Sequence, residues 1–210
     1  MIIGIHQPNF FPWLGFFDKI NKSDIFVFLD HVHNNPRDSL WTKRVKIIAN
    51  KAEYWLTVPI ERPKKVVSLP VKEMKISSHQ GQFREKHLKN ITHSYEKTKF
   101  FAEVFPFIED FYNDHSEYIS NRNYNFIVKI CHELGIKKEI IISSNYSWEK
   151  TSTELLIDII TKLNGTSYLC GGGAGGYQDD NLFIENKINL VYQKFNHPIY
   201  QQSNSNKFIE

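Results

Sequence analysis

The sequence predicts an α/β fold, namely a mostly parallel, Rossmann-like sheet flanked by helices, with a helical block inserted in the middle. Three observations indicate this. An apolar run, a stretch of helical periodicity and a second apolar run follow one another within the first 30 residues, which is typical of a βαβ unit. Residues 79–134 are helical in pattern. After them, strand-like runs that lack polar alternation flank a further helix, as in sheets that are covered on both faces.

The first βαβ unit occupies residues 1–30. Residues 1–5 form a short apolar strand, and apolar residues then recur every three positions over 12–21, which predicts a helix. Pro12 suits the first turn of that helix, because an N–H group there has no intrahelical partner. The run DIFVFLD, residues 24–30, predicts a strand buried on both faces, parallel to the first.

The next segments are loop and hairpin. Residues 31–39 are rich in Asn, Pro, Asp and Ser, so they predict a loop directly after the second strand. RVKIIA (44–49) and YWLTVPI (54–60) predict two strands of a hairpin with NKAE as the turn. Segment 62–78 has no clear period and is compatible with an extended edge piece.

The helical region 79–134 is expected to break near Phe105 and Pro106, because proline lacks the N–H group that a helix interior needs. Gly135 is expected to end the region as a C-cap. Residues 139–143, EIIIS, then return to strand.

TSTELLIDIITKLNG, residues 151–165, predicts a helix with Thr151 or Ser152 as its N-cap and Gly165 as its terminator. Three segments complete the chain: a strand SYLCG (167–171), a loop GGAGGYQDD (172–180) and a last strand INLVYQKF (188–195).

Length and composition favour a single soluble unit. With 210 residues, we expect one α/β domain over 1–202, with a helical insertion at about 79–134 and a polar tail at 203–210. No run reaches the ~18 apolar residues of a membrane span, and the polar residues 6–8 interrupt the apolar start. We therefore expect no membrane span, no secretory signal and a cytoplasmic location. The two cysteines predict no disulfide framework.

The charge is mild overall, with a formal net charge of +3, but lysines and arginines concentrate in the middle third of the chain. That basic region suits phosphate, a nucleotide sugar or RNA as partner, and a solvated face that only keeps the protein soluble is the alternative. We expect no DNA partner, and a homodimer remains open.

Polar loops at strand ends form the predicted site, because ligands of parallel sheets bind outside the carboxyl ends of the strands. His6, whose ordinary pKa lies near working pH, suits a general base. Gln7 and Asn9 suit neutral hydrogen bonds to a sugar, ribose or base. The alternative is that Asn9 caps the helix and His6 is a satisfied buried histidine. The polar loops are residues 6–9, 31–37 and 171–177.

Further candidates follow other strands. The glycine run 171–176 either lets a ligand approach the backbone closely or is a flexible connector. Cys170 is either a thiol nucleophile or a small buried residue. The histidines of the helical region lack carboxylate partners at metal spacing, so we expect no metal. The remaining candidates either bind a phosphate, a diphosphate or an attached base, or are only turn and surface residues. They are Asp30, Arg37, Trp41, Lys43, Arg44, Ser143 and Ser144.

The opening IHQPNFFPWLGFFDKINKSDIFVFLD resembles the signature of the WbqC-like protein family, in which His-Gln-Pro-Asn and Phe-Pro-Trp-Leu-Gly recur. The similarity continues through WLTVPI, HLKNITHSYEK, LGIKKEIIISS, SYLCGGGAGGY and FNHPIYQQ, and so covers nearly the whole chain. Cys170 is a departure, since serine or alanine is expected there. The site residues implied by matching position are His6, Gln7, Pro8, Asn9, Trp13, Gly15, Gly171, Gly172 and Tyr177.

The resemblance implies work on nucleotide-linked sugars in bacterial surface polysaccharide (O-antigen) biosynthesis. Our first hypothesis is a transferase that attaches an acyl or aminoacyl group, such as glycyl, to the amine of a nucleotide-linked amino sugar. In it His6 accepts a proton, Gln7 and Asn9 orient the amine or stabilise the oxyanion, and basic residues hold the diphosphate. No resident cofactor is certain, and the donor is an acyl-CoA or an aminoacyl-tRNA. The basic residues are Arg37 with Lys43 or Arg44.

Two alternatives remain. One is a nucleotidyl-transfer or adenylate-forming enzyme, because a strand, a histidine-containing turn and a helix also open such enzymes. The other is a non-catalytic partner that binds a nucleotide sugar or another enzyme of the assembly pathway through its exposed aromatic residues.

Overall fold

The computed structural model describes residues 1–34, 40–61, 64, 67–78, 82–172, 178–202 and 208. The chain divides into two compact units. Unit 1 comprises residues 1–7, 13–31 and 131–196, and unit 2 comprises residues 8–12, 32–130 and 197–210. The expectation of one domain over 1–202 stays a prediction beside this division.

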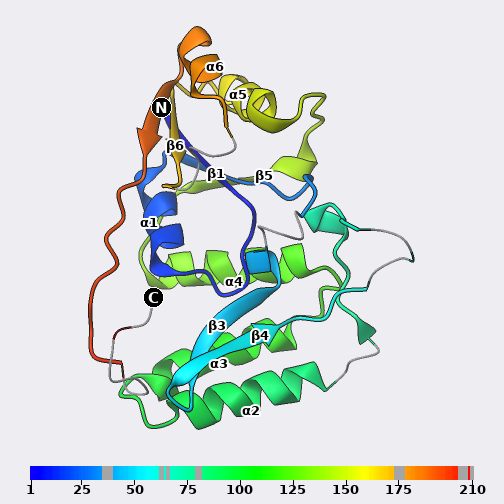
Figure 1. Cartoon of the computed structure of the whole chain (residues 1–210), viewed down its shortest axis with the longest axis vertical. Helices are drawn as coiled ribbons and strands as arrows, with labels where there is room; N and C mark the ends of the chain where they lie inside the picture. The colour runs from blue at the N-terminus through cyan, green and yellow to red at the C-terminus, as the bar shows by residue number, and fades with distance from the viewer. Residues whose placement is uncertain are drawn as a thin grey trace. The chain divides into compact units, whose positions relative to one another are not determined.

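Unit 1 contains a sheet of five parallel strands, which confirms the predicted fold class (Figure 1). The order across the sheet is β5-β2-β1-β6-β7, so the first strand lies in the middle and the chain builds outward first on one side and then on the other. That order is typical of a doubly wound, Rossmann-like sheet. The strands are β1 (Ile2–His6), β2 (Ile25–Phe28), β5 (Glu139–Ile142), β6 (Ser167–Cys170) and β7 (Asn189–Tyr192).

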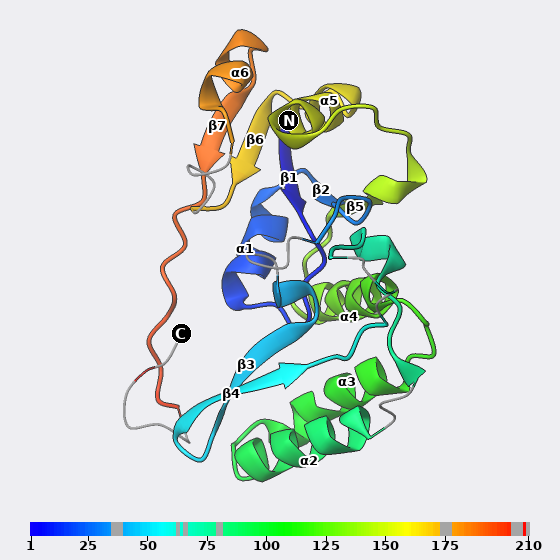
Figure 2. The ribbon, with the colours of Figure 1, turned by 45° about the vertical axis from the view of Figure 1, so that its right-hand side comes forward.

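Helices cover both faces of this sheet (Figures 1 and 2), with α1 (Leu14–Lys22) on one face and α5 (Ser152–Lys162) on the other. Successive residues of β1 face opposite helices, as the pleat requires. A Cβ atom added to Gly4 would lie 2.1 Å from Ser23 Oγ at the end of α1, whereas one added to Gly165, after α5, would lie 2.4 Å from Ile3 Cγ1. Close packing of both helices on β1 therefore depends on glycine.

The end of α5 corrects one prediction. The helix ends at Lys162, and the left-handed residue that terminates it is Asn164, with φ of 56°, in place of the predicted Gly165. Asparagine tolerates that conformation because its side chain is short and polar. The short helix α6 (Asp180–Glu185) was not predicted, because six residues are too few to show a period. Its cap is clear in the structure, where the Asp179 side chain accepts the N–H of Asn181 at 3.0 Å.

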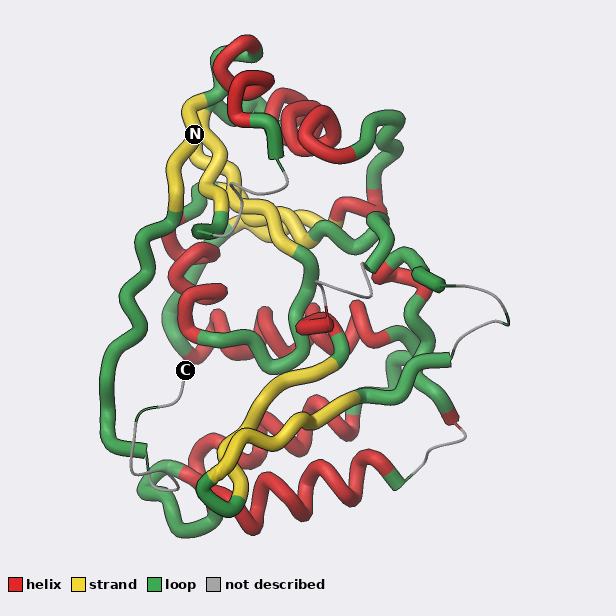
Figure 3. The backbone as a smooth tube through the Cα atoms, viewed as in Figure 1, coloured by secondary structure: helices red, strands yellow, loops and turns green. Residues whose placement is uncertain are grey.

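Unit 2 combines the predicted hairpin with three helices, and Figure 3 shows the hairpin running along α2 and α3. Strands β3 (Arg44–Ala49) and β4 (Ala52–Thr57) pair antiparallel. Their turn has only two residues, Asn50 and Lys51, both with positive φ, and is thus shorter than the expected NKAE. The helices are α2 (Phe83–Tyr95), α3 (Phe101–Asn113) and α4 (Ile119–Glu133).

The predicted break at Phe105 and Pro106 is wrong, because Pro106 lies inside α3. Proline frees the carbonyl four residues earlier, that of Ala102. Ala102 and Pro106 are both exposed, so water can donate a hydrogen bond to the Ala102 carbonyl. The breaks fall instead between the helices. Gly135 is confirmed as the terminator of α4, with φ of 68° and its N–H bonded to the His132 carbonyl at 3.0 Å.

The core of unit 2 is aromatic and includes part of the opening motif. Phe10 and Phe11 stack at 4.3 Å between ring centroids, and both contact Phe111, at 5.1 and 4.9 Å. The Asn123 side-chain amide donates to the Pro8 carbonyl at 3.0 Å and to the carbonyl of Thr42 at 2.8 Å. Residues 8–12 thus leave the sheet unit and pack into unit 2.

Short 3₁₀ turns occupy Leu40–Thr42, Val71–Glu73 and Ser143–Asn145. The segment with no clear period, 62–78, pairs only through isolated bridges in its described part, such as Ile60 with Ile76. Within the described ranges, no helix is both long and apolar enough to cross a membrane.

Candidate functional site

The strands β1 and β6 separate at their carboxyl ends. Their pairing runs from Ile2 to Gly4 on β1 and stops at Leu169 on β6. On its other side, β1 continues to pair with β2 as far as His6, and β6 pairs with β7 as far as Cys170. This is the point where the strand order reverses, which is where doubly wound sheets bind ligands. We call it the switch point.

His6 ends β1 at the switch point in one defined tautomer. Its Nδ1 lies 2.8 Å from the Gln7 carbonyl oxygen. Since a carbonyl can only accept, Nδ1 is the atom that bears the proton and Nε2 is the unprotonated one. Burial, and then the charge of Lys19, lower the pKa of His6 from 6.5 to about 4, although the backbone contact opposes this. His6 is therefore neutral at physiological pH, with the Nε2 lone pair able to accept a proton or hydrogen bond.

Lys19 lies beside His6 and was missed from the sequence. It belongs to α1, is only 3% exposed, and its ammonium donates to the Ile5 carbonyl at 2.7 Å. The ammonium also lies 5.7 Å from the centre of the Tyr168 ring. Burial lowers the pKa of Lys19 from 10.5 to about 8. A signal did exist, because Lys19 follows Phe16 by three positions and so lies on the apolar stripe of the helix.

Cys170 ends β6 and is fully buried. Its thiol donates to the Val191 carbonyl at 3.5 Å. Burial raises the pKa of the thiol, which Lys19 partly opposes, so Cys170 remains protonated at neutral pH. The thiol is thus a neutral neighbour of Lys19, and this environment disfavours a nucleophilic role.

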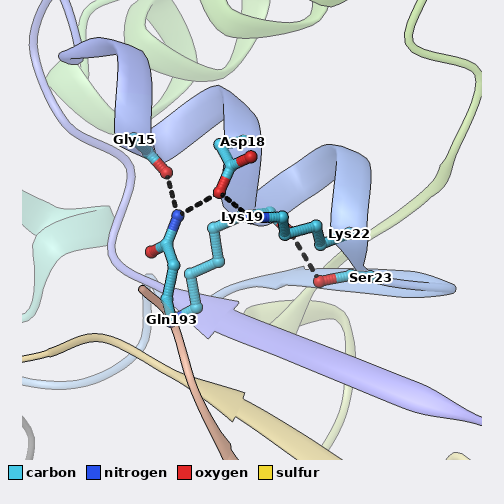
Figure 4. Close-up of polar contacts among 6 residues, drawn as sticks. All are labelled: Gly15, Asp18, Lys19, Lys22, Ser23 and Gln193. Carbon is cyan, nitrogen blue, oxygen red and sulfur yellow. Dashed lines mark hydrogen bonds and ion pairs between the residues drawn. The ribbon is translucent and has the colours of Figure 1, made fainter. Parts of the chain in front are cut away.

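The start of α1 is tied to the end of β7 (Figure 4). The Gln193 side-chain amide donates to the Gly15 carbonyl at 2.7 Å and to Asp18 Oδ2 at 2.8 Å, while Asp18 also pairs with Lys22 at 2.9 Å. A Cβ atom on Gly15 would lie 2.2 Å from the ring of Trp13, which folds back over the helix start and stays 52% exposed. The structure thus brings together the predicted residues Trp13 and Gly15.

Gly171 and Gly172 follow β6 at the switch point. Among the described residues, a Cβ atom on Gly171 would meet nothing within 4 Å, and one on Gly172 would meet only the Gln193 carbonyl, at 3.8 Å. Packing against described residues therefore does not require glycine at either position. Two of the predicted residues, Arg37 and Tyr177, lie outside the described residues.

A second polar cluster links the carboxyl ends of β2 and β5. The buried carboxylate of Asp30 accepts the Ser143 hydroxyl at 2.9 Å, and it accepts both the N–H and the hydroxyl of Ser144, at 2.9 and 2.6 Å. These predicted binding residues thus contact one another. His31 Nδ1 lies 2.7 Å from Ser143 Oγ, and the His31 ring stacks on Trp148 with 6.2 Å between centroids.

The direction of the Ser143 hydroxyl proton indicates a structural role for this residue in the cluster. Its hydroxyl proton points to Asp30, so toward His31 its oxygen accepts. In a Ser-His-Asp triad the serine donates to the histidine instead. Ser143 is also completely buried. The cluster joins two loops by hydrogen bonds, and His31 does not activate the Ser143 hydroxyl as the histidine of a triad would.

Several predicted residues belong to unit 2. Arg44 stacks its guanidinium 4.1 Å above the Trp55 ring, and Trp41 packs against Trp55 at 5.6 Å while staying exposed. Lys43 directly precedes β3. Asn9 is buried and is not the cap of α1, whose N-cap residue is Trp13, without a side-chain capping hydrogen bond. The binding and catalytic roles assigned to these residues stay predictions.

No group of three or more His, Cys, Asp or Glu side chains that could hold a metal occurs in the part of the chain that the structure describes. The described residues of the switch point offer an ammonium, an imidazole and unhindered backbone at two glycines, a set that suits an anionic or polar ligand.

Comparisons with known proteins agree with the resemblance of the opening motif. No solved structure matches the chain. An uncharacterized protein of Mycobacterium tuberculosis, Rv1507c, is 27% identical over 191 residues, which cover 90% of this chain and 80% of that protein. The family model described as WbqC-like protein family matches residues 7–210. Since that match covers nearly the whole chain, the protein belongs to the WbqC-like protein family.

Proposed function

We propose that the protein is an enzyme of bacterial surface polysaccharide (O-antigen) biosynthesis that transfers an acyl or aminoacyl group to the amine of a nucleotide-linked amino sugar. The single observation on which the proposal depends is the state of His6, a neutral imidazole with unprotonated Nε2 at the end of the central strand. The Rossmann-like strand order and the family membership support it further.

The proposed chemistry needs one proton acceptor that later returns the proton. The neutral sugar amine attacks the acyl carbonyl carbon, an N–C bond forms, and the carbonyl oxygen becomes an oxyanion. His6 Nε2 takes a proton from the attacking nitrogen. When the carbonyl re-forms, the bond to the leaving group breaks, and the CoA thiolate or the ribose oxygen of tRNA receives that proton.

The environment of His6 suits this relay better than it suits a strong base. Because burial and the charge of Lys19 lower the pKa of His6 to about 4, its imidazolium is acidic and gives up the proton readily. In the proposal, Gln7 orients the amine beside His6. The donor is an acyl-CoA or an aminoacyl-tRNA, and the diphosphate is a ligand for basic side chains.

To test the proposal, the purified protein is incubated with nucleotide-linked 4-amino sugars and either acyl-CoAs or glycyl-tRNA. Mass spectrometry follows the increase in mass of the sugar nucleotide. We expect product with one pair, and we expect His6→Gln to lower the rate by about 10²- to 10⁴-fold, as for loss of a general base. The control is His132→Gln, at an exposed histidine near the end of α4, which should leave the rate unchanged.

Two results would contradict the proposal: no product with any pair of substrates, or an undiminished rate for His6→Gln. Release of diphosphate from ATP in the presence of a sugar phosphate would instead support the nucleotidyl-transfer alternative. Stable binding of a nucleotide sugar without turnover in any mixture would support the non-catalytic alternative.

A further inference from the structure

The Lys19 ammonium lies between β1 and β6 at the switch point. The His6 carbonyl accepts the N–H of Leu29 after β2, so the carbonyl one residue earlier, that of Ile5, points to the β6 side. The pairing with β6 has already ended at Gly4, and Lys19 donates to this Ile5 carbonyl at 2.7 Å. Its contact with the Tyr168 ring on β6 agrees with that placement.

This ammonium is buried without a counter-charge among the described residues. None of the ion pairs there involves Lys19. An ammonium has three donors, and only one of them has a partner in the described residues, the Ile5 carbonyl. Of its close neighbours, His6 is neutral and Cys170 is a protonated thiol. The glycine run after β6, residues 171–176, contains no acidic residue in its sequence.

A buried charge without a counter-charge is costly, so its presence at a ligand-binding position needs a reason. The neighbouring Asp18 does not supply one, because its carboxylate is occupied by Lys22 and Gln193 (Figure 4). At Gly171, next to this position, an added Cβ atom would meet no atom of the described residues within 4 Å. An anionic group of a ligand would complete the missing interactions of the ammonium.

We propose that Lys19 is the anion-binding group of the switch point and that its ammonium donates to a phosphate or carboxylate oxygen of the ligand. The identification of that anion with the diphosphate of a sugar nucleotide rests on the proposed function, whereas anion binding by Lys19 does not.

The test measures the melting temperature of the full chain with inorganic pyrophosphate, and separately with citrate, in buffer without divalent metal. A ligand that binds only the folded state raises the melting temperature by mass action. We expect pyrophosphate to stabilise the wild type and to have no effect on Lys19→Met, which keeps the apolar stem and removes the charge. Lys22→Met is the matched control, an exposed lysine of the same helix with the same change of net charge, and should respond as the wild type does.

The two ligands distinguish the sources of the anion. Stabilisation by pyrophosphate assigns a phosphate ligand, and stabilisation by citrate alone assigns a carboxylate; either result supports the proposal only if Lys19→Met abolishes it. An undiminished response in Lys19→Met, or no response of the wild type to either anion, would overturn the proposal. If Lys19→Met does not fold, the Lys19 amine signal of wild-type protein labelled with ¹⁵N-lysine decides: it should shift on titration with the active anion, and an unmoved signal overturns the proposal.

The outcome is separable from that of the proposed function. Binding of pyrophosphate through Lys19 together with a complete absence of transfer would refute the transferase and leave the anion site standing. Conversely, transfer that requires His6 but is unchanged in Lys19→Met, together with no response of the melting temperature to either anion, would refute the anion site and leave the transferase standing.

Discussion

Buried polar side chains both connect loops of this chain by hydrogen bonds and make up its candidate site. Asp30 is satisfied by serine donors, and His6 is held in a single tautomer by a backbone carbonyl. Lys19 differs from both, because its charge has no carboxylate partner in the described ranges. Satisfied groups stabilise the fold, whereas a buried group with unfilled hydrogen-bonding capacity needs another explanation, and for Lys19 we propose a ligand.

Removal of the Ser143 hydroxyl tests the structural interpretation of the Asp30 cluster. Ser143→Ala leaves His31 Nδ1 and the Asp30 N–H without their acceptor, which should lower the free energy of unfolding by about 1–3 kcal/mol. Urea unfolding measures the difference. Ser147→Ala, at an exposed serine of the following loop, is the control and should change stability by less than ~0.5 kcal/mol. Equal stability of the two variants would contradict a structural role for Ser143.

The central strands of the parallel sheet, β1, β2 and β6, were predictable because each is a short apolar run, as burial on both faces of a sheet favours. Less predictable were features that depend on tertiary surroundings. Pro106 remains within α3 because the carbonyl that it frees is exposed, and Asn164 rather than Gly165 terminates α5. In each case the residue type suggested a helix end, and packing or solvent decided otherwise.

The candidate site was predictable to the same extent. His6 ends an apolar strand that the sequence predicts, whereas its place at the switch point follows from the strand order, which the structure supplies. Lys19 was missed because a lysine in a helix is normally solvated, although its place on the apolar stripe was visible. Contacts distant in sequence, such as Gln193 with Gly15, have no local signal at all.

At the scale of elements, Gly165 should matter for the packing of β1 against the chain after α5. In Gly165→Ala the new Cβ atom would lie 2.4 Å from Ile3 Cγ1 and 3.1 Å from the backbone oxygen of Ile160. Overpacking of this kind costs about 1–3 kcal/mol, which denaturant unfolding would show. The Cβ atom of Gly171→Ala would meet no atom of the described residues within 4 Å, so this variant serves as the control with nearly unchanged stability. A variant Gly165→Ala as stable as Gly171→Ala would show that the loop relaxes freely.

In the molecule as a whole, the opening motif belongs to both compact units. His6 and Gln7 end a strand of unit 1, whereas Phe10 and Phe11 are part of the aromatic core of unit 2. The polar interruption after β1 therefore marks the position where the chain passes from one core to the other.

Each unit also contains one histidine that burial keeps neutral, and this gives the molecule a predictable response to acid. Burial lowers the pKa of both His6 and His87 from 6.5 to about 4, with Lys19 and Lys86 as the second causes. Between pH 6.5 and 4 the unfolded chain binds these protons and the folded chain does not. The stability is therefore complete above pH 6.5 and falls as pH decreases toward 4, by at most about 3 kcal/mol for each histidine.

Urea unfolding at pH 7, 5.5 and 4.5 measures this response. His6→Gln and His87→Gln should each flatten the dependence on pH, and the double variant should flatten it further than either single change. His132→Gln, at an exposed histidine, is the control and should retain the wild-type slope. Because His6 lies in unit 1 and His87 in unit 2, two probes that report on different units would separate the two contributions if the units unfold independently. A wild type whose stability is constant from pH 7 to 4.5 would contradict the neutral state of both histidines, and with it the proton relay proposed for His6.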